Sequence, residues 1–416
     1  MRHIHKFYHE ISSAKFEQLF EKRSTFDSAV HLGLSIKPIA QPNTYELYYV
    51  PSAQMLSMMS ELYKVSRDFN DTFEELPNIA RRQFINECIV EELYNTNELE
   101  GIRSSREEIA RSTRDIIEKK KTNKRFESMI RSYHQLIKNE YEVPVSAKDI
   151  RKIYDDITKG EIEQQELPDG EIFRQEVTYI VKKSVSGKVV HHGIIPESEI
   201  IRLIEKLLKF MNNNFEIPNL IKVAVGHYYF GYIHPFYDGN GRTSRFISSI
   251  YLSQDLGDIP ALSLSRGCNK YRTKYMEAFE ITNSIKSRGE MNSFIETFLD
   301  ITIRALKQMH EELKEKNELL KLAFERIKLD SRLSSLTGMY TDIMFVLAQN
   351  YFFDSNSGLT AGNLAAIFDK SEATIRKMIK ELTALSMVEQ KGERPAYFCV
   401  THNYFEDRTG YPSSKL

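Results

Sequence analysis

The chain has 416 residues, of which 41% are hydrophobic and 28% are charged, and its formal net charge is -1 at pH 7. This length predicts two or three structural units, and the composition excludes a disordered or fibrous protein. The small net charge argues against a protein whose whole surface binds nucleic acid, although it is compatible with a local basic patch.

The three cysteines, Cys88, Cys268 and Cys399, are far apart and lack metal-ligand spacing. This pattern is typical of free thiols in a reducing compartment. The N-terminal residues lack the apolar run of a signal peptide, and no stretch approaches ~20 uncharged apolar residues. We therefore expect a cytoplasmic protein without a zinc site or a membrane segment.

Most of the chain shows the apolar periodicity of helices. Residues 1 to about 50 are assigned only as an irregular lead-in with at most one helix. Apolar residues then recur at helical spacing, and the helices predicted before residue 233 cover residues 51–71, 75–95, 104–121, 196–213 and 217–232. The sequence thus predicts a mainly α protein.

One stretch differs from this helical pattern. Residues 177–181 and 189–192 are rich in β-branched side chains and flank Gly187 and its polar neighbours, which predicts a β-hairpin. His191 and His192 end this hairpin, and we expect both to be exposed.

The C-terminal part again reads as helical. Helices are expected up to residue 256, then through residues 275 and 298, and again over 301–329, where apolar residues fall near heptad spacing. Because that last run is only ~4 heptads long, it favours a connector helix packed on a neighbouring unit over a free coiled coil.

The final segment, about 339–400, predicts three helices followed by two strands. Thr360 and Ser371 are expected helix caps, and the order of elements resembles a winged helix. Basic residues lie on or beside its expected recognition helix and wing, and acidic residues dilute them. DNA binding and protein recognition or dimerisation therefore both remain open. The basic residues are Lys370, Arg376, Lys377, Lys380, Lys391 and Arg394.

A dense cluster of chemically useful residues follows the helix that ends near residue 232. It reads His234-x-Phe236-x-Asp238-Gly239-Asn240-Gly241-Arg242-x-x-Arg245. The glycine-rich turn lets backbone N–H groups converge on an anion, and the start of the next helix adds its own N–H groups and dipole. Arg242 and Arg245 are three apart, so both can reach a polyphosphate.

The remaining motif residues suggest a proton acceptor and a metal ligand. A carboxylate at Asp238 would repel phosphate unless a cation lay between them, which assigns it to Mg²⁺. His234 can take a proton from an attacking hydroxyl. Phe236 is expected to anchor the loop in the core.

The stretch from His234 to Arg245 resembles the complete signature of the Fic (filamentation induced by cyclic AMP) domain. This resemblance implies a helical Fic core with a small β-hairpin flap. It also implies transfer of AMP from ATP, with Mg²⁺, to a hydroxyl side chain of a protein. His234 would be the general base, Asp238 the Mg²⁺ ligand, Gly239, Asn240 and Gly241 the anion hole, and Arg242 and Arg245 the phosphate-binding residues. Gly241 favours adenylyl transfer, because relatives that act as kinases have lysine there.

The resemblance also implies roles for two further features. The hairpin around Gly187 resembles the flap that holds the target chain by strand addition. Thr96-Asn97-Glu98-Leu99-Glu100-Gly101 resembles the family's inhibitory pattern, in which Glu100 would pair with Arg245 and occupy the space of the γ-phosphate. Tyr271 and Tyr275 could line an adenine pocket, with core packing as the equal alternative, and His227 is expected to be a hydrogen-bonded core histidine.

The sequence therefore predicts an auto-inhibited protein adenylyltransferase whose target carries a Ser, Thr or Tyr hydroxyl. The chain itself is one candidate target, and a homodimer is one candidate oligomeric state. One alternative is hydrolytic removal of AMP from the modified protein, in which Glu100 assists the attacking water molecule. The other is a DNA-binding regulator that senses nucleotide through its Fic domain. The expected segments are a lead-in over 1–54, a Fic domain with its inhibitory helix over 55–305, a connector helix over 306–335, a winged helix over 336–403 and a tail over 404–416.

Overall fold

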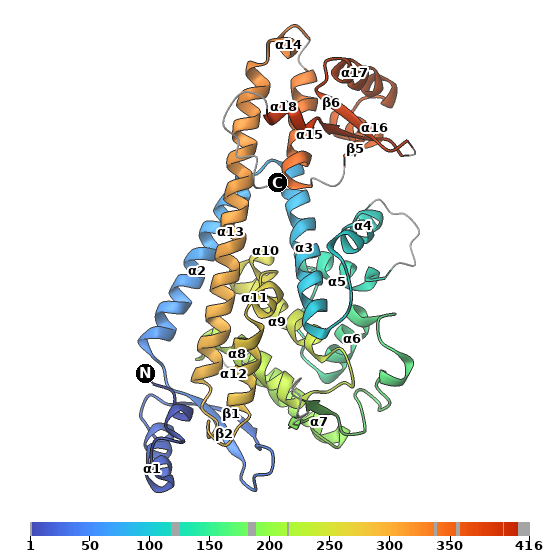
Figure 1. Ribbon diagram of the computed structural model, residues 1–416. Coiled ribbons are helices and arrows are strands. Elements are labelled where there is room, and N and C mark those ends of the chain that lie inside the picture. Colours follow the sequence, from blue (N-terminus) through green and yellow to red (C-terminus); the bar gives the residue numbers. More distant parts are fainter. Residues whose placement is uncertain are drawn as a thin grey trace. The chain divides into compact units, whose positions relative to one another are not determined.

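The structure, a computed structural model (Figure 1), describes residues 2–117, 125–181, 189–213, 216–336, 339–354, 358–393 and 395–406. It divides the chain into two compact units. The first comprises Met1–Asp68 and Cys88–Gln308, and the second comprises Phe69–Glu87 and Met309–Leu416. Helices predominate in both, and the sheets are small and antiparallel, so the expected mainly helical class is confirmed.

The first unit begins with structure that the sequence analysis did not assign. After η1 (Ile4–Phe7) and α1 (Ser13–Ser24), strands β1 (Val30–Ile36) and β2 (Tyr45–Tyr49) form an antiparallel hairpin. Buried residues alternate with more exposed ones along β1, which is the period-two pattern of a half-buried strand. The lead-in is therefore ordered, and it contains a hairpin as well as a helix.

The helices of the first unit build most of its interior. Those with bounds wholly inside it are α4 (Arg106–Ile117), α5 (Glu127–Ile137), α6 (Ala147–Thr158), η2 (Gln164–Glu166), α7 (Glu197–Asn213), α8 (Asn219–Ile233), α9 (Asn240–Leu256), α10 (Asp258–Ala261), α11 (Leu264–Lys270) and α12 (Arg272–Thr282). Three longer helices contribute residues to both units, namely α2 (Ala53–Glu74), α3 (Asn78–Glu100) and α13 (Asn292–Leu329).

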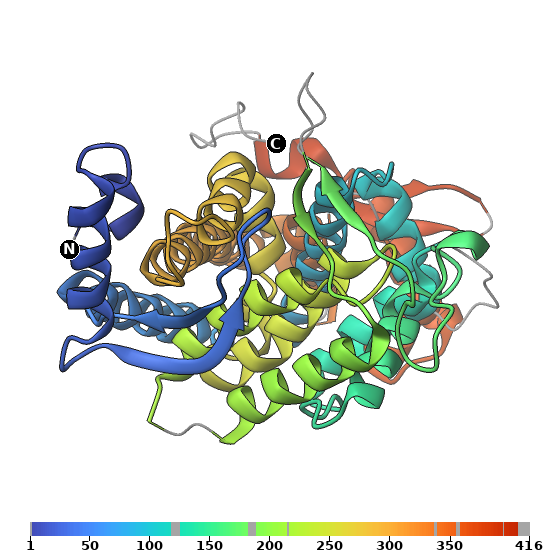
Figure 2. The same cartoon turned by 90° about the horizontal axis from the view of Figure 1, so that it is seen from below.

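Helix α8 is the most buried element of this unit, and it packs against α7 and α9. Its apolar residues are spread around the helix with few polar ones between them, which is the composition of a core helix rather than of a surface helix. The hairpin β3 (Tyr179–Val181) and β4 (Val189–His192) is antiparallel, as predicted, and Gly187 lies outside the described residues. Figure 2 shows this hairpin in green and the β1–β2 hairpin in blue.

Helix α3 is longer than its periodicity predicted, because it continues to Glu100. Leu99 is buried in its last turn, and Arg272 of α12 donates to the carbonyls of Glu98 (3.2 Å) and Leu99 (2.8 Å). A cation that bonds to the last carbonyls stabilises a helix end. Thr96 and Glu100 are therefore both helical residues of α3.

The second unit contains the rest of α13, followed by short helices and a three-stranded sheet with the order β5-β7-β6. The expected seam on α13 is buried, including Leu313 and Leu320. Thr360 and Ser371 cap the helices that follow them, as expected. The remaining elements are α14 (Ser331–Ser334), α15 (Met339–Phe353), β5 (Leu359–Thr360), α16 (Ala361–Phe368), α17 (Glu372–Ala384), β6 (Val388–Lys391), β7 (Tyr397–Val400) and α18 (His402–Glu406).

The winged-helix assignment of this last segment stays a prediction, as do its DNA and protein partners. On α17, Lys377 and Lys380 are exposed, whereas Arg376 pairs with Glu372 at 3.1 Å. Arg394 lies outside the described residues. In the described part of the chain, no helix is both long and apolar enough to span a membrane. All three cysteines are buried, and no disulfide joins them.

Candidate active site

The predicted motif forms the turn between α8 and α9. α8 ends at Ile233, and His234 leaves the helix in the left-handed conformation (φ 52°, ψ 63°) with its N–H bonded to the Phe230 carbonyl at 2.9 Å. Gly239, also left-handed (φ 79°), is the N-cap of α9. Glycine adopts this conformation without strain, whereas histidine does so at a cost. Contacts from elsewhere in the unit must therefore hold His234.

Phe236 and Asn240 stabilise the turn through packing and hydrogen bonds. The Phe236 side chain is fully buried and stacks on Tyr154, with ring centroids 3.8 Å apart, so its anchoring role is confirmed. The Asn240 amide bonds to both the N–H (3.0 Å) and the carbonyl (2.7 Å) of Phe236. Asn240 was predicted to bind nucleotide, and in this structure its side chain closes the loop.

Arg242 and Arg245 are both buried at the start of α9, with 1% of each residue exposed. Arg245 donates to Thr96 Oγ1 at 2.9 Å and to Glu100 Oε1 at 2.5 Å. Arg242 reaches Asp238 Oδ2 only at 3.5 Å, and its Nε and Nη1 have no hydrogen-bond partner among the described residues. Because a buried unpaired donor is costly, this guanidinium indicates a place for an anion.

The Glu100 carboxylate lies over the first turn of α9. A Cβ added at Gly241 would lie 2.1 Å from Glu100 Oε1 and 3.0 Å from Arg245 Nη1. Burial opposes ionisation of Glu100, but the charge and hydrogen bond of Arg245, aided by Arg242, outweigh it and lower the pKa of this carboxyl. The charged carboxylate therefore occupies the position that the helix N-terminus offers to an anion.

The His234 side chain is set up to remain neutral. Burial, with smaller effects of His191 and Arg174, lowers its pKa to about 3, although Glu100 acts in the opposite direction. The backbone of Gly231 acts in the same direction as Glu100. A neutral imidazole has one unprotonated ring nitrogen, which can accept a proton.

Asp238 is partly open to solvent, with 47% of its side chain exposed. Its Oδ1 accepts from Gly239 N–H at 2.6 Å. Within the described ranges, no three His, Cys, Asp or Glu side chains gather to hold a metal. A single accessible carboxylate beside an anion site nevertheless fits Mg²⁺, which binds through one or two carboxylates together with substrate phosphates and water.

The two tyrosines considered for an adenine pocket are placed differently. Tyr275 is buried beside Arg245, and its hydroxyl bonds to His227 Nε2 at 2.8 Å. The Tyr271 ring instead lies 5.8 Å from the Arg304 guanidinium carbon. His227 is a buried, hydrogen-bonded core histidine, as expected.

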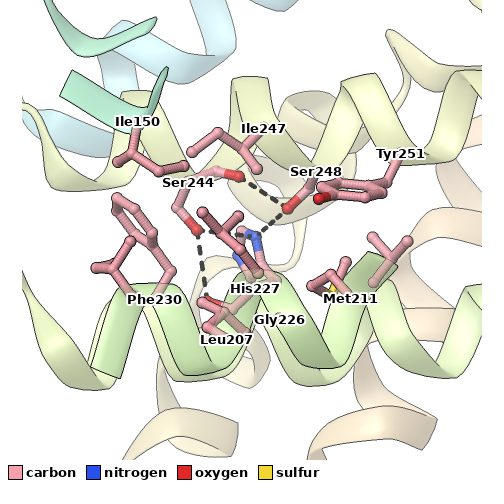
Figure 3. Close-up of a pocket in the computed structure, with 13 residues that line it drawn as sticks. Ile150, Leu207, Met211, Gly226, His227, Phe230, Ser244, Ile247, Ser248 and Tyr251 are labelled. Carbon is pink, nitrogen blue, oxygen red and sulfur yellow. Dashed lines mark hydrogen bonds between the residues drawn. The ribbon is translucent and has the colours of Figure 1, made fainter. Parts of the chain in front are cut away.

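His227 borders a small internal cavity lined by residues of α7, α8 and α9. Figure 3 shows its bonds to Ser248 (2.8 Å) and Ser244 (3.2 Å) among mostly apolar lining residues. The cavity encloses about 20 Å³, which is room for about one water molecule. Its size excludes a nucleotide, so this cavity is not the candidate site.

Sequence reasoning was wrong about His191 and missed Arg174. His191 is only 4% exposed, and its Nε2 lies 2.5 Å from the Tyr232 carbonyl. The physical reason is strand alternation, which turns His192 outward and His191 inward. Arg174 is fully buried and donates to the His234 carbonyl at 2.9 Å. Nothing in its local sequence distinguishes it from a surface arginine.

Comparison with known proteins identifies the region around this site. Residues 144–252 match the Fic/DOC family, and this range contains the motif from His234 to Arg245 but not Glu100. Curated proteins named protein adenylyltransferase Fic, from Aedes aegypti and Culex quinquefasciatus, are each 32% identical to the chain over 83 residues. The match covers 20% of this chain and only 15% of each relative.

Similar solved structures include a Fic family protein from Desulfovibrio desulfuricans G20 and a Fic-1 fragment from C. elegans. The first has a TM-score of 0.49 and 15% identity, over 85% of this chain and 98% of that one. The second has a TM-score of 0.42 and 17% identity, over 62% of this chain and 74% of that one.

Proposed function

Residues 144–252 are a domain of the Fic/DOC family, and from this premise we propose that the chain is a protein adenylyltransferase that transfers AMP from ATP to a protein hydroxyl group. Proteins with 32% identity over part of the chain carry the name protein adenylyltransferase Fic. The observation that carries the proposal is the buried Arg242, whose Nε and Nη1 lack partners among the described residues. An ATP phosphate would satisfy both donors.

The proposed reaction forms one bond and breaks another at the α-phosphorus. The target oxygen bonds to phosphorus, the bond from phosphorus to the bridging oxygen of the β-phosphate breaks, and pyrophosphate leaves. His234 takes the hydroxyl proton, for which its neutral state suits it. Arg242, Arg245 and the N–H groups at the start of α9 stabilise the phosphate charge. Asp238 would hold Mg²⁺, which when bound neutralises part of that charge.

The target chain would bind at the β3–β4 hairpin. Tyr179 on β3 is 55% exposed, and a two-stranded hairpin leaves edge N–H and C=O groups that an extended segment can pair with. Pairing through the backbone would place a Ser, Thr or Tyr hydroxyl near His234 without a strict sequence requirement. The target and its modified residue are therefore questions for labelling of cell extracts.

Glu100 would be an internal brake on this reaction. Its carboxylate already binds Arg245 at 2.5 Å, so a phosphate and Glu100 compete for the same guanidinium. Adding phosphate beside an ionised carboxylate is unfavourable, and ATP would lie in a non-productive position. Release of Glu100 from Arg245 is the activating step in this proposal.

Incubation with ATP labelled at the α-phosphate and Mg²⁺ tests the proposal. We expect weak labelling of the wild-type chain or of added proteins, more labelling with Glu100→Gly, and none with Glu100→Gly combined with His234→Ala. Glu98→Gly is the matched control, because it places the same residue in the same helical turn without removing a partner of Arg245. Equal labelling by all variants would refute the assignments of His234 and Glu100.

A second candidate, hydrolytic removal of AMP, is favoured by one observation. Glu100 lies close enough to His234 to raise its pKa against the larger effect of burial, so the carboxylate could orient a water molecule for attack on a phosphodiester. Protein labelled by the Glu100→Gly variant would then release AMP when wild-type chain is added. Release by Glu100→Gly itself at the same rate would exclude this role for Glu100.

A further inference from the structure

The end of α8 is bonded to the segment that carries the β3–β4 hairpin. Four successive carbonyls, those of Tyr232, Ile233, His234 and Pro235, accept hydrogen bonds from residues 174–194. The last carbonyls of a helix have no partner within the helix. The base of the hairpin supplies these partners one after another.

The four bonds come from three residues. His191 Nε2 lies 2.5 Å from the Tyr232 carbonyl, and Ile194 N–H donates to Ile233 at 3.1 Å. Arg174 supplies the other two, through Nε to the His234 carbonyl (2.9 Å) and through its own N–H to Pro235 (3.3 Å). Arg174 is therefore the residue that donates to the backbone carbonyl of His234, the proposed proton acceptor.

Arg174 also contacts the hairpin directly. Its Nη1 donates to the Glu176 carbonyl at 2.5 Å, just before β3. On the other side, a Cβ at Gly193 would lie 2.1 Å from Nη2, so only glycine leaves room for the guanidinium there. The side chain thus lies between the two ends of the hairpin and the turn that carries His234.

The surroundings of Arg174 argue against a simple structural ion pair. Its side chain is fully buried and donates to backbone carbonyls, while the charge of Asp169 attracts it without a hydrogen bond among the described residues. Its charge is stabilised by carbonyl dipoles at the negative end of α8 instead. Burying an arginine whose hydrogen-bond acceptors are neutral carbonyls is costly, so Arg174 is better explained by the positions that its bonds fix.

We propose that Arg174 is a positioning residue that holds His234 in its left-handed conformation and fixes it to the base of the β3–β4 hairpin. The proposed proton acceptor and the proposed target-binding strand would then keep one fixed geometry. This inference rests on the proposed adenylyl transfer for its kinetic consequence, but the coupling between Arg174 and His234 can be measured without it.

The kinetic test uses Arg174→Met and Arg174→Lys in the Glu100→Gly background. Small displacements of catalytic groups cost up to ~100-fold in rate, so kcat should fall at least ~10-fold with Arg174→Met while KM for ATP stays within ~2-fold. Arg174→Lys keeps the positive charge but lacks the several N–H donors of a guanidinium, so its kcat should lie between those of the parent and Arg174→Met. Arg151→Met is the matched control, since Arg151 bonds to the Ile172 carbonyl but not to the motif, and should keep kcat.

The second test follows the ¹³C-labelled imidazole of His234 by NMR across a pH titration, assigned by its loss in His234→Gln. The groups that face His234 are His191, Arg174 and Glu100. Removing the Arg174 charge should move the titration of His234 to higher pH, and Arg151→Met should leave it in place. An unchanged kcat together with an unchanged His234 titration in folded Arg174→Met would overturn the proposal.

Two further outcomes separate the possible failures. If Arg174→Met does not fold, Gly193→Ala displaces the guanidinium from the hairpin side, and it should lower kcat as well; an unaltered kcat would again overturn the proposal. If the Glu100→Gly chain shows no transfer at all, the proposed function fails. The His234 titration then decides the coupling alone.

Discussion

Removal of the Glu100 carboxylate should destabilise the chain in a way that nucleotide reverses. The Arg245 side chain is buried, with 2% exposed, and in Glu100→Ala it would lose its charged partner and keep its bonds to Thr96. Breaking a buried ion pair by removing one partner costs ~3–5 kcal/mol. Because 23% of the Glu100 side chain is exposed, we expect a smaller loss of about 2–3 kcal/mol in the free energy of unfolding.

A phosphate should replace the lost carboxylate. A ligand at 100 times its Kd stabilises the folded state by ~2.7 kcal/mol, so ATP should restore most of the stability of Glu100→Ala. The wild-type chain should gain less, because ATP must first displace Glu100. Urea unfolding with and without ATP measures both differences, and Glu98→Ala serves as the control.

The pH dependence gives an independent check. The pKa of Glu100 is lowered in the folded state, so its contribution to stability is present above the unfolded pKa of ~4.3 and is lost as the pH falls through the folded value. The gap between wild type and Glu100→Ala should therefore close on acidification. A variant as stable as wild type at pH 7, or an equal gain from ATP in both, would refute the competition.

Three further predictions concern buried residues and the glycine-rich turn before α9. Because burial lowers the pKa of His227 and of His234 from 6.5 to about 3, the unfolded state binds more protons between these values, so stability should fall as the pH drops below 6.5, and less steeply in His227→Gln. Phe236→Ala should lower the free energy of unfolding by ~3–5 kcal/mol, measured by urea unfolding. Gly241→Ala should crowd both Glu100 and the phosphate position, so ATP labelling should not rise as it does in Glu100→Gly.

The sequence alone located the motif and most long helices, because both depend on local pattern. The turn from His234 to Gly239, the start of α9 and the caps at Thr360 and Ser371 follow from residue types at fixed spacing. The capping box at Ser146, which begins α6, was equally readable but was not used. Such features need no knowledge of distant contacts.

What the sequence did not reveal depends on long-range pairing. The β1–β2 hairpin forms from strands with weak individual signals, and the inward side of His191 is decided by the register with β3. Arg174 gains its role only when the chain brings residues 60 positions apart together. A buried arginine has no local signature, because arginine is normally a surface residue.

The bonded base of the β3–β4 hairpin sets a boundary for redesign. A chimera that exchanges only residues 181–190 would keep Arg174, His191 and Ile194, and with them every partner of the four carbonyls at the end of α8. A graft that begins before Arg174 would remove those partners together with the old hairpin. Grafts that test the proposed target-binding role of the hairpin should therefore place their junctions inside this base.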